Sequence, residues 1–281
     1  MIKLSQDLIE QAARVAPDAT LATHFLLPEA RPAMLALLLF HHEIARARQV
    51  VSESMLAAMR LQWWRETVHE IYQANRVRGH PIAEALAQTI RQHELPRAHF
   101  DAMIDAYGAE QEPQPFRDWP ALLAHCDQSL GQFHRLALLI GGVGALSCPL
   151  DEACKQAGIA WRLWELMAHW PKWAQRHQCW LPSEALTSAD LEEVCRGALS
   201  LAAQSGLRQA KDQINTALNA ANRALVRADL NQAFGAIAYV SLARTYANRF
   251  TRLTDPYVHP VQISLLRRQM LLIWSVARQR L

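Results

Sequence analysis

The chain has 281 residues, enough for one large domain or two ordinary ones with a well-buried core. Leucine and alanine are abundant and only 10 glycines occur, a composition that favours helices over sheets. The formal net charge of +3 is too small to indicate nucleic-acid binding, and no basic stripe interleaved with aromatic residues suggests it either.

The predicted elements are helices, read from hydrophobic periodicity and from the prolines and glycines that interrupt it. We expect Ser5 to cap the first helix, Pro17 to stop it and Pro171 to break a later one. The clearest loop covers 111–119. The expected helices cover 6–15, a stretch that starts near Pro32 and continues past Ile44, 55–74, 82–93, 99–108, 121–144, 151–170, 190–195, 199–225, 228–250 and 261–281. No internal repeat or low-complexity linker divides them, so we predict one all-α domain, residues 1–281.

The helix that starts near Pro32 changes character along its length. It is almost continuously apolar as far as Phe40 and becomes polar from His41 onward, with a short break expected at 50–53. A helix that is apolar at one end and polar at the other is typical of a closed bundle with a polar cavity mouth.

The cysteines and apolar runs bear on location. The five cysteines are an odd number without a CxxC pair, and we interpret them as reduced thiols in a cytosolic protein. The longest apolar window, 34–40, is far shorter than the ~20 residues that cross a bilayer, and the N-terminal stretch has no signal-peptide apolar core. We expect a cytoplasmic protein, with peripheral contact with the inner membrane left open.

Two segments together resemble the squalene/phytoene synthase family of all-α isoprenoid synthases. The first matches the pattern LLPxxxRxAxxALxxF through Leu26, Leu27, Pro28, Arg31, Ala33, Leu37 and Phe40. The second, residues 158–182, retains Gly158, Ile159, Ala160, Leu163, Leu166, Ala174, Arg176, Leu181 and Pro182. The resemblance implies a single isoprenoid-synthase-type helical bundle with a central cavity.

In that family two aspartate-rich motifs face each other across the cavity and hold Mg²⁺, which binds the diphosphate leaving group. The motif positions carried over to this chain are occupied by Ala45, Arg46, Gln49, His169 and Trp173, and no motif aspartate remains. Arg46 would place a cation where a metal ion should sit. The resemblance therefore implies no catalytic residue and no cofactor, with Mg²⁺ expected only if the chain is an active transferase.

The segments FHHEIARARQVVSESM and MRLQWWRETVHEIY are similar to the branch of this family related to a mitochondrial complex I assembly factor. The leading hypothesis is a degenerate, non-catalytic family member that binds lipid or protein partners and aids assembly of a membrane respiratory complex. The first alternative is an active head-to-head prenyl transferase that uses Glu43, Glu165 and His169 as non-standard ligands. The second is a metal-independent carrier of isoprenoids or phospholipids. We expect an isoprenoid or lipid ligand or membrane-complex subunits as partners, and no nucleic acid.

The candidate cavity-lining and anion-binding residues are Arg31, His42, Glu43, Arg46, Glu165 and His169. A His/Glu cluster can bind a transition metal, but polar groups bonded to one another are the more common arrangement, and we predict no metal site. The arginines at 31, 46, 48, 60 and 65 can hold an anion or pair with the glutamates at 43, 53 and 66. The tryptophans between 161 and 180 can line a tunnel or contact a membrane interface, although core packing is the simpler interpretation.

Overall fold

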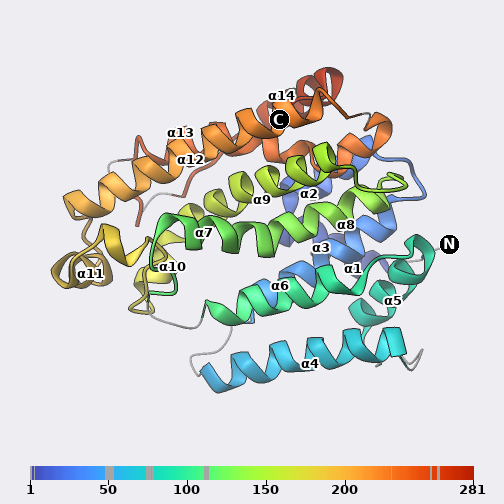
Figure 1. Ribbon diagram of the computed structural model, residues 1–281, viewed down its shortest axis with the longest axis horizontal. Coiled ribbons are helices and arrows are strands. Elements are labelled where there is room, and N and C mark those ends of the chain that lie inside the picture. The colour runs from blue at the N-terminus through green and yellow to red at the C-terminus, as the bar shows by residue number, and fades with distance from the viewer. Residues whose placement is uncertain are drawn as a thin grey trace.

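The computed structural model describes residues 2, 4–47, 54–73, 77, 79–110, 114–228, 230–253, 255–257 and 260–281. These residues form helices and connecting turns, with no strand among them (Figure 1). The prediction of an all-α bundle is therefore confirmed.

The first helices are α1 (Gln6–Val15), α2 (Pro17–Ala22), the 3-10 turn η1 (Thr23–Phe25), α3 (Arg31–Ala45), α4 (Ser54–Gln73), α5 (Pro81–His93) and α6 (Arg97–Ala109). The middle of the chain forms α7 (Trp119–Cys126), the π-helical turn η2 (Asp127–Gly131), α8 (Gln132–Ile140), α9 (Cys148–Ala168), α10 (Trp170–Ala174) and η3 (Ser183–Ala185). The last third forms α11 (Ser188–Cys195), α12 (Leu201–Leu225), η4 (Asn231–Ala236), η5 (Ala238–Leu242), α13 (Ala243–Phe250) and α14 (Leu265–Arg278).

Local chemistry fixes many of the helix starts. The Ser5 hydroxyl accepts a hydrogen bond from Leu8 N, as predicted for the cap of α1. Proline occupies the first turn of α2, α3, α5, α7, α9 and α10. N–H groups in the first turn have no partner within the helix, so the missing N–H of proline removes no helical hydrogen bond there. Pro17 and Pro171 thus begin short helices as well as ending the ones before them.

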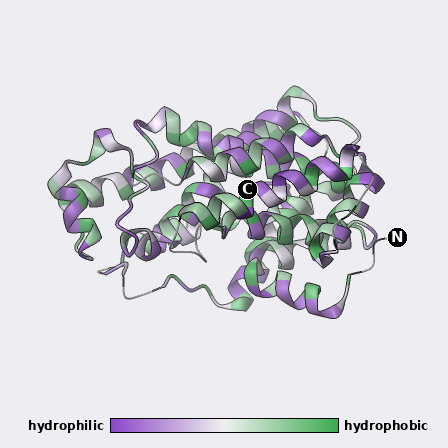
Figure 2. Cartoon of the chain, turned by 90° about the horizontal axis from the view of Figure 1, so that it is seen from below, coloured by the Kyte–Doolittle hydropathy of each residue, from purple (hydrophilic) through white to green (hydrophobic). Residues whose placement is uncertain are grey.

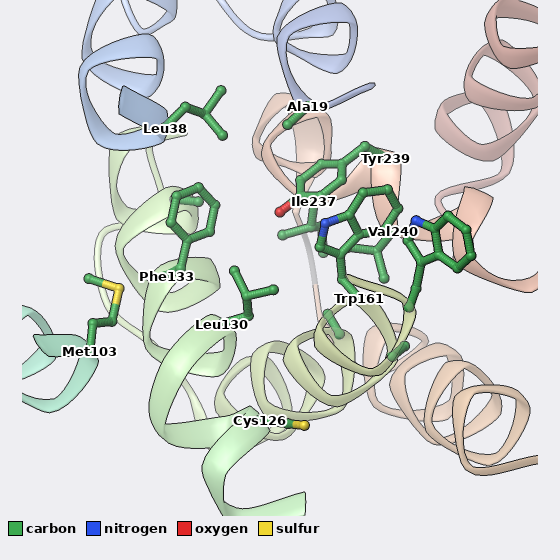
Figure 3. Packing of buried hydrophobic residues seen from close by; sticks show 14 of the residues in the cluster. Ala19, Leu38, Met103, Cys126, Leu130, Phe133, Trp161, Ile237, Tyr239 and Val240 are labelled. Carbon is green, nitrogen blue, oxygen red and sulfur yellow. The ribbon is translucent and has the colours of Figure 1, made fainter. Parts of the chain in front are cut away.

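Helix α9 lies at the centre of the bundle, between α12 on one side and α7 and α8 on the other (Figure 1). It packs most extensively against α12, and its middle crosses η2 at very short range. Side chains from α3, η2, α8, α9 and η5 meet in one apolar core, including Leu38, Leu130, Phe133, Trp161 and Tyr239 (Figure 3). This core forms the inner wall of the site described below.

Hydrophilic and hydrophobic residues alternate along the outer helices (Figure 2), as amphipathic helices require when one face packs on the core.

The tryptophans between 161 and 180 are all buried, which confirms that they belong to the core. All five cysteines are free thiols. No helix in the described part of the chain is long and apolar enough to cross a membrane.

The prediction of one long helix over 228–250 is wrong. The chain instead forms the two 3-10 segments η4 and η5 before α13 begins at Ala243. The physical reason is a close tertiary contact: a Cβ atom added at Gly235 would lie 2.8 Å from the backbone carbon of Phe25 in η1. The predicted helix over 121–144 is likewise divided, because the π-helical turn η2 separates α7 from α8.

Candidate functional site

A pocket of about 430 Å³ opens between α3, α9 and the junction of α1 with α2. Its wall is apolar on the inner side, where Leu38, Leu130, Phe133, Trp161 and Tyr239 contribute. Polar and charged side chains lie on the same wall, and these are Arg14, Asp18, His41, His42, Arg46, Arg162, Glu165, His169 and Lys172. A smaller cavity of about 30 Å³ adjoins it and shares Ala45, Arg162, Glu165, His169 and Lys172.

The positions that correspond to the two aspartate motifs come together at this pocket. Ala45 and Arg46 approach from the end of α3, and His169 approaches from the end of α9. Trp173, in α10, lines the smaller cavity. Gln49 lies outside the described residues. The bundle therefore brings the motif positions together, but it presents side chains other than aspartate there.

The electrostatic centre of the site is a buried ion-pair group around Arg162 of α9. Its guanidinium donates to Glu110 Oε1 through Nη2 and to Glu165 Oε2 through Nη1, the latter at 3.0 Å. Glu165 Oε1 also accepts from Trp161 Nε1 at 3.1 Å, and His125 Nε2 lies 2.7 Å from Glu110 Oε1. Both carboxylates are thus held by donors within the protein.

Burial and pairing set the charge of this group. Burial disfavours the ionised carboxylate of Glu110, but the Arg162 charge and the His125 hydrogen bond outweigh it and lower the pKa of Glu110 to about 2. Burial raises the pKa of Glu165, although the charge and hydrogen bond of Arg162 act in the opposite direction. Burial opposes the charge of Arg162 as well, yet Glu110, Tyr107 and Glu165 keep its pKa well above the ordinary value. Arg162 is therefore a permanent cation.

Two histidines of the site, His41 and His169, are neutral near pH 7. Burial, reinforced by the charge of Arg162, lowers the pKa of His41 to about 3, and His41 Nε2 lies 2.6 Å from the Tyr107 hydroxyl. Burial, with Lys172 nearby, lowers the pKa of His169 to about 4. His169 Nδ1 lies 2.9 Å from the Glu165 carbonyl oxygen. Because that carbonyl can only accept, Nδ1 carries the proton and Nε2 is left as an acceptor.

The other predicted site residues have local partners. Glu43 is buried and pairs with Arg46 at 2.7 Å, which agrees, for Glu43 alone, with the interpretation that the arginines pair with nearby glutamates. Arg65 pairs instead with Asp105 at 2.7 Å. Arg48 and Glu53 lie outside the described residues.

Arg31 lies at the start of α3 and is not among the lining residues of the pocket. Its guanidinium donates to the carbonyl oxygens of Leu26 and His24, at 3.2 and 3.1 Å. His42, Arg46, Glu165 and His169 do line the pocket, so four of the six predicted residues converge there.

Sequence reasoning missed Glu110, Arg162 and Tyr107, which organise the interior of the site. One signal was available: Arg162 lies within a largely apolar helical segment, and a charge in such a place needs a buried partner. Its partner Glu165 is three positions away, but its partner Glu110 could not be identified, because Glu110 is 52 positions away in the chain.

The charged side chains that line the pocket include more cations than carboxylates. The cations are Arg14, Arg46, Arg162 and Lys172, of which Arg46 pairs with Glu43, and Arg162 with Glu110 and Glu165. The two carboxylates on the wall in the described chain, Asp18 and Glu165, are each engaged by an arginine. The described residues contain no group of three or more histidine, cysteine or acidic side chains placed to hold a metal ion.

The fold and the paired motif helices define the class as an all-α bundle of the isoprenoid-synthase type. The chain belongs to the squalene/phytoene synthase family, whose model matches residues 12–269. A dehydrosqualene synthase structure superposes with a TM-score of 0.77 at 11% identity, covering 97% of this chain and 95% of that one. Squalene synthase HpnC from Alicyclobacillus acidocaldarius superposes with a TM-score of 0.71 at 16% identity, covering 88% of this chain and 94% of that one. At such identities these likenesses show the fold alone.

The curated relatives have a different name. "NADH dehydrogenase (ubiquinone) complex I, assembly factor 6" of Bos taurus is 28% identical over 160 residues, 57% of this chain and 47% of the relative. The Homo sapiens protein of that name is 27% identical over 160 residues, with the same coverage. The chain thus spans about half the length of the curated relatives it matches. The resemblance to the assembly-factor branch is confirmed.

Proposed function

We propose that this chain is a non-catalytic member of the squalene/phytoene synthase family that binds an isoprenoid or lipid phosphate in its pocket. The observation that carries the proposal is the set of side chains at the motif positions. Arg46 and His169 stand at the pocket where the family places aspartates, and Glu165 beside them is already bonded to Arg162. Mg²⁺ requires oxygen ligands at short range, and a guanidinium on the wall repels it.

The pocket supports binding without metal. Arg46 and Lys172 lie on the wall beside His169, whose neutral Nε2 adds no charge. Trp161 and Phe133 extend the wall inward as apolar surface. A phosphate can bond to the cations while an isoprenoid or acyl chain contacts the aromatic wall, and neither interaction needs a carboxylate.

The proposal extends to assembly of a membrane respiratory complex. It is supported by the relatives, which are named as assembly factors of complex I, together with the replaced motif residues. Assembly would be tested in cells that lack the chain, by the amount of mature complex I on native gels and its restoration by the wild-type chain. Unchanged complex I would contradict the assembly role without bearing on ligand binding.

The active-transferase alternative has less support. It needs Glu43, Glu165 and His169 to act as metal ligands, but Glu43 is bonded to Arg46 and Glu165 to Arg162. Glu43 is also absent from the lining residues of the pocket. Metal binding there would first require both ion pairs to break.

The deciding experiment is thermal unfolding with farnesyl thiodiphosphate, with and without Mg²⁺, together with a product assay using a labelled prenyl diphosphate. At ~100 times its dissociation constant a ligand adds about 2.7 kcal/mol to the free energy of unfolding. We expect a stabilisation without Mg²⁺ that is lost in the Arg46→Gln/Lys172→Gln variant and retained in Arg196→Gln, which removes an exposed arginine directly after α11. A Mg²⁺-dependent stabilisation with product formation would contradict the proposal.

A further inference from the structure

Helix α14 has an apolar face that no other described element covers. Leu266 is 70% exposed, Met270 59%, Ile273 51% and Trp274 55%. Their spacing of four, three and one residues places them on one side of the helix. The opposite side, with Leu272 and Ser275, is buried. Figure 1 shows α14 at the upper edge of the molecule, and the exposed fractions show that its apolar side faces outward.

All the charged side chains of the same helix are arginines. No aspartate or glutamate occurs from residue 256 to residue 281, while arginine occurs at 267, 268, 278 and 280. Arg268 turns inward and donates to Asp18 Oδ1 at 3.0 Å. Arg267, Arg278 and Arg280 are exposed, and none of them forms an ion pair with another described residue.

Trp274 and Arg278 form a local unit on this surface. The Arg278 guanidinium carbon lies 4.3 Å from the centroid of the Trp274 ring, a cation–π contact. An indole ring prefers the level of lipid head groups, and an adjacent guanidinium can reach the phosphates. The pair thus combines the two side chains that fit the boundary between water and acyl chains.

We propose that α14 is a membrane-surface helix, and that its occupant is a bilayer containing anionic lipids. The helix would lie in the plane of the interface, with Leu266, Met270, Ile273 and Trp274 among the upper acyl carbons. Arg267 and Arg278 would face the head groups. An amphipathic helix with aromatic and aliphatic residues on one side and arginines beside them is typical of such binding. The inference goes beyond the proposed function and does not depend on the pocket.

Two other occupants fit the surface less well. A second copy of the chain, related by a two-fold axis, would bring the arginines of two α14 helices together with no acidic residue on either helix to neutralise them. A membrane-spanning arrangement fails on length, because 14 residues extend only ~21 Å against a hydrocarbon core of ~30 Å.

The test is co-sedimentation of the full chain with vesicles of phosphatidylcholine alone and vesicles with 30% phosphatidylglycerol. We expect binding to the anionic vesicles that weakens at high salt. Each arginine near an anionic surface contributes about fivefold in affinity, so Arg267→Gln/Arg278→Gln should bind about 25-fold more weakly. Met270→Glu/Trp274→Glu should lose more than about tenfold through its apolar contacts.

The matched controls change the same chemistry elsewhere. Leu201→Glu alters a residue that is 84% exposed at the start of α12. Arg196→Gln/Arg208→Gln removes one charge directly after α11 and one from α12. Both controls should bind like the wild type, and circular dichroism should show that every variant is folded. Equal binding by the wild type and the Met270→Glu/Trp274→Glu variant would overturn the proposal. So would a failure of the wild type to bind anionic vesicles, or a dimer in sedimentation analysis that this variant abolishes.

Discussion

At the residue scale, Arg162 connects the parts of the polar interior. Its guanidinium bonds to Glu110 and Glu165 and lies 4.9 Å above the Tyr107 ring. Taking an ion out of water costs several kcal/mol, and the attraction between paired charges offsets this cost only where the geometry and the surrounding hydrogen bonds are good. Removing Arg162 leaves the buried carboxylate of Glu110 and the partly buried carboxylate of Glu165 without their cation.

We therefore expect Arg162→Met to lower the free energy of unfolding by about 3–5 kcal/mol, measured by urea denaturation. The matched control is Arg196→Met, which removes the arginine from the exposed Arg196–Glu192 pair, 72% and 68% exposed. Exposed pairs contribute only about 0–1 kcal/mol. Equal losses in the two variants would show that the Arg162 group does not stabilise the fold.

The site could be predicted from the sequence only in part, for reasons visible in single residues. Arg46, Glu165 and His169 were identified because they occupy positions of known motifs on two facing helices. The pairing of Arg162 with Glu110 and of Arg65 with Asp105 could not be predicted, since these residues come near one another only through tertiary packing. Helical spacing reveals neighbours on one element and says nothing of approach between elements.

At the element scale, the contact between α9 and η2 depends on two glycines. A Cβ atom added at Gly158 would lie 2.2 Å from Gly131 N and 2.5 Å from Gly131 Cα. These are backbone atoms, so relief would require the helix itself to move. The small residues let α9 lie close enough to η2 for the core of the bundle to close.

We expect Gly158→Ala to destabilise the protein by about 1–3 kcal/mol or more, as overpacking of a core does. Gly108→Ala is the control, because Gly108 also lies in a helix and its added Cβ would meet only Leu61 Cδ1 at 3.9 Å. There alanine's higher helix propensity should stabilise by up to ~1 kcal/mol. Thermal unfolding of both variants tests the contrast, and an unchanged Gly158→Ala protein would argue against tight packing.

The helices themselves were largely predictable, because periodicity and proline mark amphipathic segments such as α1, α5 and α12. Segments whose geometry is set by another element were not. Residues 231–242 have the composition of a helix but form 3-10 turns, where Gly235 meets the backbone of Phe25. Similarly, the π-helical turn at Asp127–Gly131 lies against Gly158. Local propensity gave no indication of either contact.

At the scale of the whole molecule, the buried histidines make stability depend on pH. Burial is the main cause that lowers the pKa of His41 and His134 to about 3 and that of His169 to about 4. Each ordinarily titrates near 6.5, so the unfolded chain takes up these protons first as the pH falls. Stability is therefore present above pH 6.5 and lost below it. Glu110, with its pKa lowered to about 2, adds a loss in the same direction below pH 4.5.

We expect the free energy of unfolding to fall between pH 6.5 and 4.5, with each histidine contributing a slope of up to about 1.4 kcal/mol per pH unit. Urea denaturation at several pH values measures it. The His41→Gln variant should show a slope smaller by up to about 1.4 kcal/mol per pH unit, the contribution of one proton. Glu165, with its raised pKa, contributes in the opposite sense on acidification. Because this contribution is present in both the variant and the wild type, the difference between the two slopes isolates the histidine. Identical slopes in the variant and the wild type would contradict the assignment.

The single-domain organisation, residues 1–281, stays a prediction. It has a physical basis in contacts between distant parts of the chain. Asp18 of α2 accepts from the Tyr246 hydroxyl at 2.7 Å and from Arg268 at 3.0 Å, joining the start of the chain to α13 and α14. These bonds make separate folding of the two ends unfavourable.

The Arg268–Asp18 bond also joins the pocket wall to α14. Asp18 belongs to the pocket wall, and Arg268 belongs to the helix whose outer face is proposed to contact lipid. A pocket ligand that weakens this bond would change the affinity of α14 for the bilayer. Attachment to the bilayer would then change the affinity of the pocket by the same factor, because coupling between two binding equilibria is reciprocal.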